Sequence, residues 1–331
     1  MKISDDLVVR ALLQYGVCPQ KVFPRQSGYR NKSFRVSTAE RDLNLIFFKR
    51  EPGILERINR ADAVSEFVAA KGLPVRRLHD QRTLELRGQN TISYARLYNF
   101  LPGATIAWEL YTMKHIKLLG QAMSDLHAVL EKSTISLPSA AKRCEELNRR
   151  MEEYFSQPNV CRAMAEKLKL DFDDKIFNFF SMAIHKADQS GEQIPLHLDL
   201  VRGNVLYNES SGDDRWQIDD LALSGIIDFE NVARGSALFD LARTYAFLLV
   251  DCAHKTPEKI YKYLIISGYN KRGMRQIEIT RSNETILQNL TRFYLFYDFY
   301  KFLRHNPYES LAQNHHFCRT RDILIQKNML V

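Results

Sequence analysis

Three polar residues in the second half of the chain have the types and spacing that transfer of a phosphoryl group requires. Asp199 is followed five residues later by Asn204, and Asp228 stands at the end of the apolar run 225–227. In kinase-type chemistry one carboxylate orients the attacking hydroxyl, while an amide oxygen and a second carboxylate bind magnesium. Because this catalysis consists mainly of positioning and charge neutralisation, three such side chains can carry most of the reaction. The sequence therefore predicts a reaction class and says little about the substrate.

The chain is long enough to form two lobes or domains around a cleft. It has 331 residues, 45% hydrophobic and 26% charged, which is the composition of an ordinary globular protein. No run of about 18 apolar residues is present, and acids stand where a signal peptide has basic residues. The five cysteines are scattered and never form a Cys-x-x-Cys pair, which argues against a disulfide framework and a structural zinc site. We therefore expect a cytoplasmic protein with no membrane partner.

The chain is basic, with a formal net charge of +8 and a pI near 9.1. Such a charge raises the question of a polyanionic partner. The basic residues are spread along the chain, and no zinc-finger or RNP-type motif accompanies them. Nucleic acid is therefore not the expected partner, and a smaller anionic ligand such as ATP suits this charge better.

The order of expected elements separates a strand-rich beginning from a helix-rich remainder. Apolar periodicity and turn residues predict two helices and four strands in the first part, in the order helix 2–15, strands 34–36 and 43–48, helix 55–71, and strands 84–86 and 91–98. The pair Pro102-Gly103 is typical of a boundary. Beyond it the predicted helices are 113–130, one or two over 140–182, and further helices from 236 onward.

In its motifs and their order, the chain resembles the aminoglycoside phosphotransferase and choline kinase-like family. The family pattern His-x-Asp-x-x-x-x-Asn is matched by His197, Asp199 and Asn204. The later Asp-aromatic and Asp-Leu-Ala patterns are matched at Asp228 and Asp240, and the resemblance extends over about 27–248. It implies roles for all five. Asp199 would be the catalytic base, His197 and Asp240 would support its loop, and Asn204 and Asp228 would bind Mg²⁺.

The resemblance also implies a fold of the α+β class, namely the bilobal protein-kinase-like fold. A small β-rich lobe at 1–96 would bind the nucleotide, and residues 97–103 would form the hinge. A larger helical lobe at 104–331 would carry the catalytic and substrate-binding residues. The position of Asp240 at the start of a helix is equally suited to a carboxylate that interacts with the helix dipole.

Two segments of the first lobe are expected to hold the phosphates of ATP. A turn containing Ser27, Gly28 and Asn31 can bring backbone N–H groups to the phosphates, although its single glycine departs from the glycine-rich loop of protein kinases. Lys49 ends an apolar strand and is expected to contact the α- and β-phosphates, with Glu66 of the following helix as its ion-pair partner. Arg50 would point to the opposite face of the strand.

The remaining polar residues near these motifs receive more ordinary interpretations. At the hinge, backbone groups of Leu97 and Asn99 are expected to bind adenine. His127 is expected to pack and hydrogen-bond rather than to catalyse. Three acids close to the Asp228 motif are expected to be exposed, namely Asp219, Asp220 and Glu230.

The acceptor is expected to be a small molecule with a hydroxyl group, such as a sugar, nucleoside, amino-acid-like alcohol or antibiotic. In the family the acceptor lies against the helices after the hinge and the C-terminal segment, here about 137–190 and 252–331. The latter segment is rich in Lys and Arg, which favours a neutral or anionic acceptor over a polycation. We therefore predict an ATP- and Mg²⁺-dependent small-molecule kinase. A protein Ser/Thr kinase of the same fold and a nucleotide-binding pseudokinase scaffold remain the alternatives.

Overall fold

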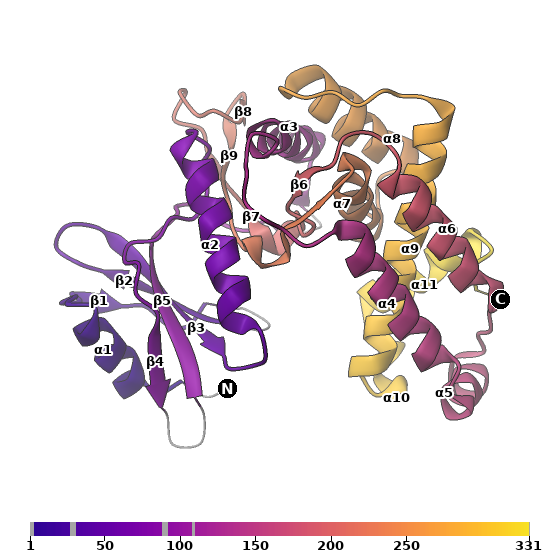
Figure 1. The fold of residues 1–331 in the computed structure, drawn as a ribbon, viewed down its shortest axis with the longest axis horizontal. Helices are drawn as coiled ribbons and strands as arrows, with labels where there is room; N and C mark the ends of the chain where they lie inside the picture. The colour runs from indigo at the N-terminus through magenta and orange to yellow at the C-terminus, as the bar shows by residue number, and fades with distance from the viewer. Residues whose placement is uncertain (1–2, 27–30, 88–91, 108–109, 331) are drawn as a thin grey trace. The chain divides into compact units, whose positions relative to one another are not determined.

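The computed structural model describes residues 3–26, 31–87, 92–107 and 110–330, which form two compact units. The first contains the residues up to Ala104 together with Ser224–Glu230, and the second contains Thr105–Leu223 and the residues from Asn231 onward. The first is rich in strands and the second in helices, which confirms the predicted α+β class (Figure 1). The short segment that carries Asp228 thus belongs to the strand-rich unit, although its neighbours along the chain belong to the helical one.

A five-stranded antiparallel sheet forms the first unit, with strand order β1-β2-β3-β5-β4. Its strands are β1 Lys21–Val22, β2 Lys32–Ser37, β3 Asp42–Lys49, β4 Leu84–Arg87 and β5 Ile92–Asn99. Two helices pack on this sheet, α1 Asp5–Gln14 and α2 Ile54–Ala70. The α1 helix begins where the Ser4 side chain accepts a hydrogen bond from Leu7 N, as an N-cap serine does.

The two helices cover opposite faces of the sheet because side chains alternate along each strand. In β3, Leu45 and Phe47 belong to the core cluster that contains the buried face of α1. Ile46 and Phe48 belong to the cluster that contains residues of α2. Residues of β3 therefore face α1 at odd positions and α2 at even positions, which decides where its polar side chains point.

The second unit consists mainly of helices. The longer ones are α3 Met113–Leu130, α4 Ala140–Phe155, α6 Lys175–Asp188, α7 Ala237–Asp251, α9 Arg281–His305 and α11 His315–Gln326. Shorter turns are α5 Pro158–Ala163, α8 Pro257–Tyr261 and α10 Tyr308–Leu311, with π-helical stretches at Met164–Leu168 and Lys262–Asn270. The segment 140–182 was expected to form one or two helices and instead contains α4, α5 and the start of α6. The reason is Pro158, which lacks an N–H group and therefore starts a new helix.

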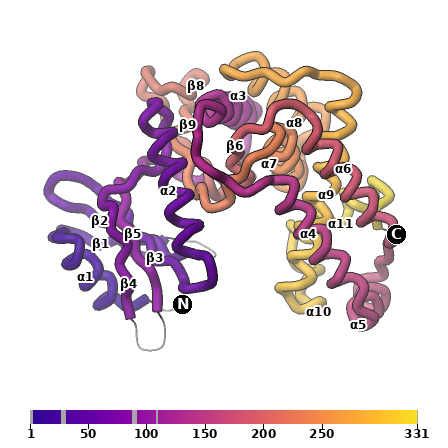
Figure 2. The backbone as a smooth tube through the Cα atoms, viewed as in Figure 1, coloured from indigo at the N-terminus to yellow at the C-terminus, as the bar shows by residue number. Residues whose placement is uncertain are grey.

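The core of the second unit is aromatic where α4, α6 and α9 run side by side (Figure 2). Phe155 of α4, Phe180 of α6 and Phe293, Phe296 and Phe299 of α9 are all at most 1% exposed. These aromatic residues of α9 are therefore part of the core. No described helix of the protein is both long and apolar enough to span a membrane.

Small strands of the second half present the loops that carry the motifs. β6 Ile194–Leu196 pairs with β10 Ala233–Gly235, and β7 Val205–Glu209 lies beside β9 Leu221–Ile226, which also pairs with β8 Gln217–Ile218. The loop with Asp199 joins β6 to β7, and the segment with Asp228 follows β9. Each motif therefore lies between two anchored strands.

Candidate active site

The carboxylate of Asp199 is held in place by two amide side chains of the second unit. Asn204 Nδ2 donates hydrogen bonds to Asp199 O, at 2.9 Å, and to Asp199 Oδ2, at 3.1 Å. Asn231 Nδ2 donates to the same Oδ2 at 3.2 Å. Since both amides bind Oδ2, the other carboxylate oxygen is the one that can accept a proton from a hydroxyl group.

The backbone of the Asp199 loop is fixed by Asp240, which lies fully buried in the first turn of α7. Asp240 Oδ2 accepts from His197 N at 2.9 Å, and Oδ1 accepts from Leu198 N at 3.0 Å. Leu198 has φ 60°, in the left-handed region that non-glycine residues rarely adopt. These bonds place a strained residue immediately before Asp199, and the buried carboxylate stabilises that conformation.

Two histidines complete this support. His127 Nε2 lies 3.0 Å from Asp240 Oδ2, and because a carboxylate can only accept, this nitrogen donates. Its Nδ1 lies 2.8 Å from the hydroxyl of Tyr269. Burial tends to raise the pKa of Asp240, but His127 and His197 outweigh it and lower the pKa below its usual value. The expected packing and hydrogen-bonding role of His127 is therefore confirmed.

His197 points its ring at the loop that it was expected to brace. Its Nδ1 accepts a hydrogen bond from Asp199 N at 3.3 Å, and its side chain is fully buried. The bond ties the residue directly to the backbone of Asp199. His197 thus contributes to positioning the carboxylate.

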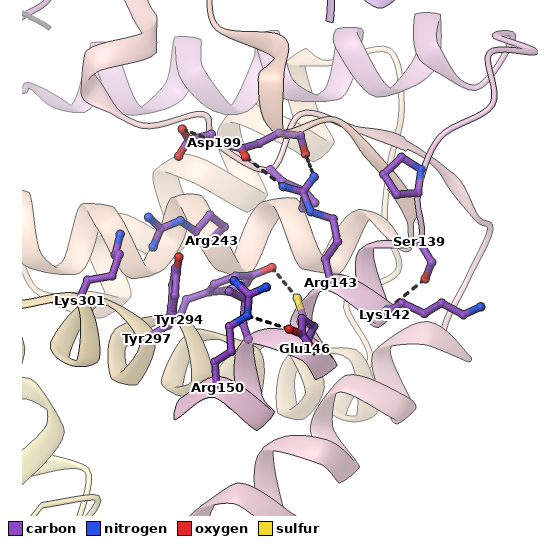
Figure 3. A pocket seen from close by; sticks show the side chains of 15 residues that line it. Ser139, Lys142, Arg143, Glu146, Arg150, Asp199, Arg243, Tyr294, Tyr297 and Lys301 are labelled. Atoms are coloured by element: carbon purple, nitrogen blue, oxygen red, sulfur yellow. Dashed lines mark hydrogen bonds and ion pairs between the residues drawn. The ribbon is translucent and has the colours of Figure 1, made fainter. Parts of the chain in front are cut away.

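A cavity of about 730 Å³ opens beside Asp199 within the second unit (Figure 3). Its walls come from the start of α4, the Asp199 loop and α9, and residues of these walls include Lys142, Arg143, Glu146, Arg150, Asp199, Asn231, Arg243, Tyr294, Tyr297 and Lys301. A cavity of this size is in the range that holds a small organic molecule. The carboxylate of Asp199 therefore lies at the wall of a pocket, where it can contact a bound molecule.

Two residues of this pocket, Asn231 and Arg143, were not predicted from the sequence as site residues. Arg143 donates to Asn231 O at 2.6 Å and to Asn231 Oδ1 at 3.0 Å, which orients the amide whose nitrogen binds Asp199. Arg143 comes from α4, far along the chain, and no local motif marks it. Asn231 follows Asp228 by three residues, and that proximity was the one available signal.

In the first unit, Glu230 was expected to be exposed, and this is wrong. The residue is 6% exposed, accepts a hydrogen bond from Asn31 Nδ2 at 2.7 Å, and lies 3.4 Å from Arg57 Nε. Burial, with the negative charge of Asp228, raises the pKa of Glu230. The reason for the error is that Glu230 packs against segments distant in sequence, which a local pattern does not reveal.

Asp228 itself has φ 66°, so a non-glycine residue again occupies the left-handed region at a motif position. Its side chain is partly exposed, and its neighbours in the first unit include Glu230 and the cationic Arg76. The other two acids behave as expected. The side chains of Asp219 and Asp220 are 71% and 88% exposed.

The expected ion pair between Lys49 and Glu66 does not form among the described residues. Glu66 Oε1 accepts from Leu78 N at 2.6 Å, and Glu66 Oε2 lies 3.4 Å from Arg77. Lys49 is exposed and, as an odd position of β3, lies on the face that α1 covers. Glu66 lies on α2, which covers the other face, so strand alternation separates the two side chains.

The buried ion pair between the sheet and α2 involves different residues. Arg96 of β5 lies 3.5 Å from Asp62 of α2, with both side chains 5% exposed. Asp62 Oδ1 also accepts from the hydroxyl of Tyr98 at 3.0 Å. Burial raises the pKa of Asp62, although Arg76 and Arg96 oppose it. The sequence did not indicate this cluster, because the apolar neighbours of Asp62 do not distinguish it from other residues on the buried side of a helix.

The other residues predicted to bind the nucleotide are Ser27, Gly28, Asn31, Leu97 and Asn99. Ser27 and Gly28 lie outside the described residues. Asn99 N donates to Arg77 O at 2.9 Å, so this N–H group is used within the unit, and the contact of a backbone group of Asn99 with adenine stays a prediction. An N–H group has one proton to donate. Leu97 stays a prediction, as does Asn31, whose described partner is Glu230.

Because Lys49 and Glu66 do not touch, we expect their substitutions to act independently. Lys49→Met and Glu66→Gln should each change the KM for ATP or the turnover by their own factor, and the double variant should lose the product of the two factors. Steady-state kinetics on the three variants and the parent measure this. A double variant no worse than either single variant would instead show that the two residues pair in the working enzyme.

Comparisons with known proteins agree with this geometry. A model of the phosphotransferase enzyme family (APH) matches residues 21–262. Similar solved structures include an amicoumacin kinase in complex with AMP-PNP and Ca²⁺ (TM-score 0.70, 12% identity, covering 99% of this chain and 95% of that one). A microcompartment-associated aminopropanol kinase has a TM-score of 0.66 at 14% identity, covering 98% of both chains.

A third similar structure is a GDP complex of aminoglycoside 2'-phosphotransferase-IIIa, with a TM-score of 0.61 at 14% identity over 98% of this chain and 99% of that one. At such identities the likeness establishes the fold, which is the protein-kinase-like fold of these enzymes. A search of curated protein sequences finds no match. Since the family model covers well over half of the chain, including the Asp199 loop, Asp228 and Asp240, the protein belongs to the phosphotransferase enzyme family.

Proposed function

We propose that the protein transfers the γ-phosphoryl group of ATP, with Mg²⁺, to a hydroxyl group of a small molecule. The observation that carries the proposal is Asp199, oriented by two amides, at the wall of a cavity of about 730 Å³. A pocket of this volume suits a small acceptor better than the extended segment of a protein substrate. Membership of a phosphotransferase family supports the same reaction.

The donors available in the chain fit a magnesium ion. Asn204 uses its amide nitrogen to bind Asp199, which leaves its amide oxygen as the acceptor atom. Asp228 offers a partly exposed carboxylate in the first unit. Oxygen donors in small number, completed by nucleotide phosphates, are what Mg²⁺ prefers. Similar structures bind AMP-PNP with Ca²⁺, or GDP, which supports a nucleotide as phosphoryl donor.

In the proposed mechanism, the free oxygen of Asp199 accepts a hydrogen bond from the acceptor hydroxyl and aims its oxygen at the γ-phosphorus. A new P–O bond forms as the bond between the γ-phosphorus and the β,γ-bridging oxygen breaks, and ADP leaves. Asp199 takes the hydroxyl proton late in the reaction and returns it to solvent. Bound Mg²⁺ would neutralise charge on the phosphates. No covalent intermediate with the protein is required.

If Asp228 binds the metal, Asp228→Ala should weaken nucleotide binding only when Mg²⁺ is present. We expect the Kd for ATP measured by titration calorimetry with Mg²⁺ to rise, and the Kd measured with EDTA to change little. The matched control is Asp220→Ala, which removes an exposed acid close in sequence. An equal change in both conditions would contradict a role in metal binding.

The proposed function is tested by measuring acceptor-dependent formation of ADP. The purified protein is incubated with Mg-ATP and each of a set of sugars, nucleosides, hydroxy amino acids, amino alcohols and aminoglycosides. Product phosphorylation is verified by ³¹P NMR, with Asp199→Ala as the negative control. Nucleotide binding without transfer to any acceptor would favour the scaffold alternative, and transfer to protein hydroxyls alone would favour a protein kinase.

A further inference from the structure

The cavity beside Asp199 has a strong excess of positive charge. Five basic residues line it against two acidic ones, Glu146 and Asp199. Arg149 and Asp298, which pair with Glu146 and Arg243 but do not line the cavity, carry opposite charges and leave the excess at three. A small pocket with this excess attracts anions and repels cations, and it does so most strongly where water is partly excluded.

Two of the basic residues form hydrogen bonds with other residues in or beside the pocket wall. Arg143 binds Asn231, as described above, and Arg243 binds Asp298 Oδ2 at 2.8 Å while lying beside Asp199. Arg243 is 7% exposed. Asp298 and Asp199 raise its pKa although burial opposes them, so it stays protonated next to the reactive carboxylate. These two residues position the catalytic end of the cavity.

Arg150 and Lys301 are different, because each shares its acidic partner with a second cation. Arg150 lies 2.7 Å from Glu146, which also binds Arg149 at 2.9 Å. Lys301 lies 2.7 Å from Asp298, which also binds Arg243. The two side chains are 53% and 39% exposed, and both line the cavity, Arg150 from α4 and Lys301 from α9 (Figure 3). Each has donors left for a ligand.

We propose that the acceptor is an alcohol that also carries an anionic group, a carboxylate or a phosphate monoester, and that Arg150 and Lys301 bind this group. The inference rests on the proposed function, since it assumes that the acceptor hydroxyl lies at Asp199. Both cations line the cavity whose wall also carries Asp199, so they can bind another group of a molecule whose hydroxyl lies at Asp199. Charge-assisted hydrogen bonds to carboxylate or phosphate are the interactions that their donors suit.

The same charge distribution argues against a polycationic acceptor. An aminoglycoside or an amino alcohol would place ammonium groups against this positive wall, with Glu146 and Asp298 already bound to cations. Tyr294 and Tyr297 also line the cavity, and Arg243 lies over the ring of Tyr294 while Lys301 lies over the ring of Tyr297. Both aromatic faces are therefore already engaged by cations of the protein.

The test uses two series of alcohols, each on one carbon skeleton, in which one hydroxyl or hydroxymethyl group is replaced or phosphorylated so that the charge changes. One series is glucose, glucuronate, glucose 6-phosphate and glucosamine, and the other is glycerol, glycerate, glycerol 3-phosphate and 3-aminopropane-1,2-diol. Binding is measured by titration calorimetry in the presence of AMP-PNP and Mg²⁺, and kcat/KM is measured with ATP. We expect an anionic member to exceed its neutral parent by at least about tenfold and the amine to be the weakest. The carboxylate and phosphate members distinguish the two sources of negative charge.

The double variant Arg150→Gln/Lys301→Gln should reduce the preference for the anion over the neutral parent by at least about tenfold and leave AMP-PNP binding unchanged. Its matched control is Lys186→Gln/Arg304→Gln, which removes one arginine and one lysine from exposed positions outside the cavity and should keep the preference. The inference is overturned if no anionic member in either series is preferred, or if the amine is. It is also overturned if both double variants lose the preference equally.

These outcomes separate the inference from the function on which it rests. Transfer to glucose or glucosamine with better kcat/KM than to their anionic relatives would keep the phosphotransferase and overturn the anionic acceptor. Absence of nucleotide binding and of transfer would instead count against the proposed function. Anion binding that Arg150→Gln/Lys301→Gln abolishes would still support the pocket assignment in that case.

Discussion

Asp199→Ala is expected to reduce turnover by about two to four orders of magnitude, the scale of general-base and positioning effects. The variant loses the carboxylate oxygen that would accept the hydroxyl proton, and it also loses the acceptor for Asn204 and Asn231. Nucleotide binding should persist, because Asp199 is not among the residues proposed to hold ATP or Mg²⁺. Single-turnover kinetics with the acceptor identified by the screen, together with calorimetry of Mg-ATP binding, measure the two effects separately.

The control for this prediction is Asp220→Ala, which removes an acid that is 88% exposed. It should turn over at the parent rate. If Asp199→Ala also kept the parent rate with the true acceptor, the assignment of Asp199 as the catalytic base would be wrong. A fall in rate that followed only from weaker Mg-ATP binding would point to a metal-binding role for this carboxylate instead.

Asp240→Asn is expected to lower both stability and turnover although the substitution barely changes side-chain volume. The carboxylate accepts from three donors, with two on Oδ2 and one on Oδ1. An asparagine in either orientation turns its NH₂ group toward at least one of these N–H groups, and it leaves a buried donor without an acceptor. We expect a loss of about 1 to 3 kcal/mol in the free energy of unfolding. Turnover should fall on the order of 100-fold, the scale of a small misplacement of catalytic groups.

The effect of Asp240→Asn on catalysis can be separated from its effect on stability in two ways. Activity is assayed well below the melting midpoint of the variant, and the substitution is repeated in a Leu198→Gly background. Leu198 is held at φ 60°, a conformation that glycine adopts without strain. The loss of turnover caused by Asp240→Asn should therefore be smaller in a Leu198→Gly background than in the parent background. Equal losses in both backgrounds would show that Asp240 does not act through the conformation of this loop.

Several elements of the fold could be predicted because their signals are local. The helix that became α1 has its cap, its acidic first turn and its buried face within a dozen residues, and the strands of the first unit are bounded by turn residues. The segment 140–182 was harder, because a proline marks a break but periodicity does not fix the number of helices on either side. Element types were therefore more predictable than their boundaries.

The residues of the candidate site likewise divide into those that a local pattern indicates and those that only long-range packing brings together. Asp199 and Asn204 are five residues apart and contact each other, so their spacing alone indicated a joint role. Asn231 reaches Asp199 across 32 residues, and Arg143 reaches Asn231 across 88, with no pattern that connects them. Glu230 was expected to be exposed for the same reason, since its burial depends on Asn31 and Arg57.

The sequence by itself determined the reaction class, because the order and spacing of short motifs carry the chemistry of phosphoryl transfer. Only the tertiary structure decided which side chains meet. Strand alternation and helix packing placed Lys49 and Glu66 on opposite faces of a sheet and brought α4 and α9 together around a cavity with excess positive charge. The physical reason is that a motif depends on backbone geometry over a few residues. A pocket depends on the packing of elements that lie up to a hundred or more residues apart, as His127 and Asp240 do across 113 residues.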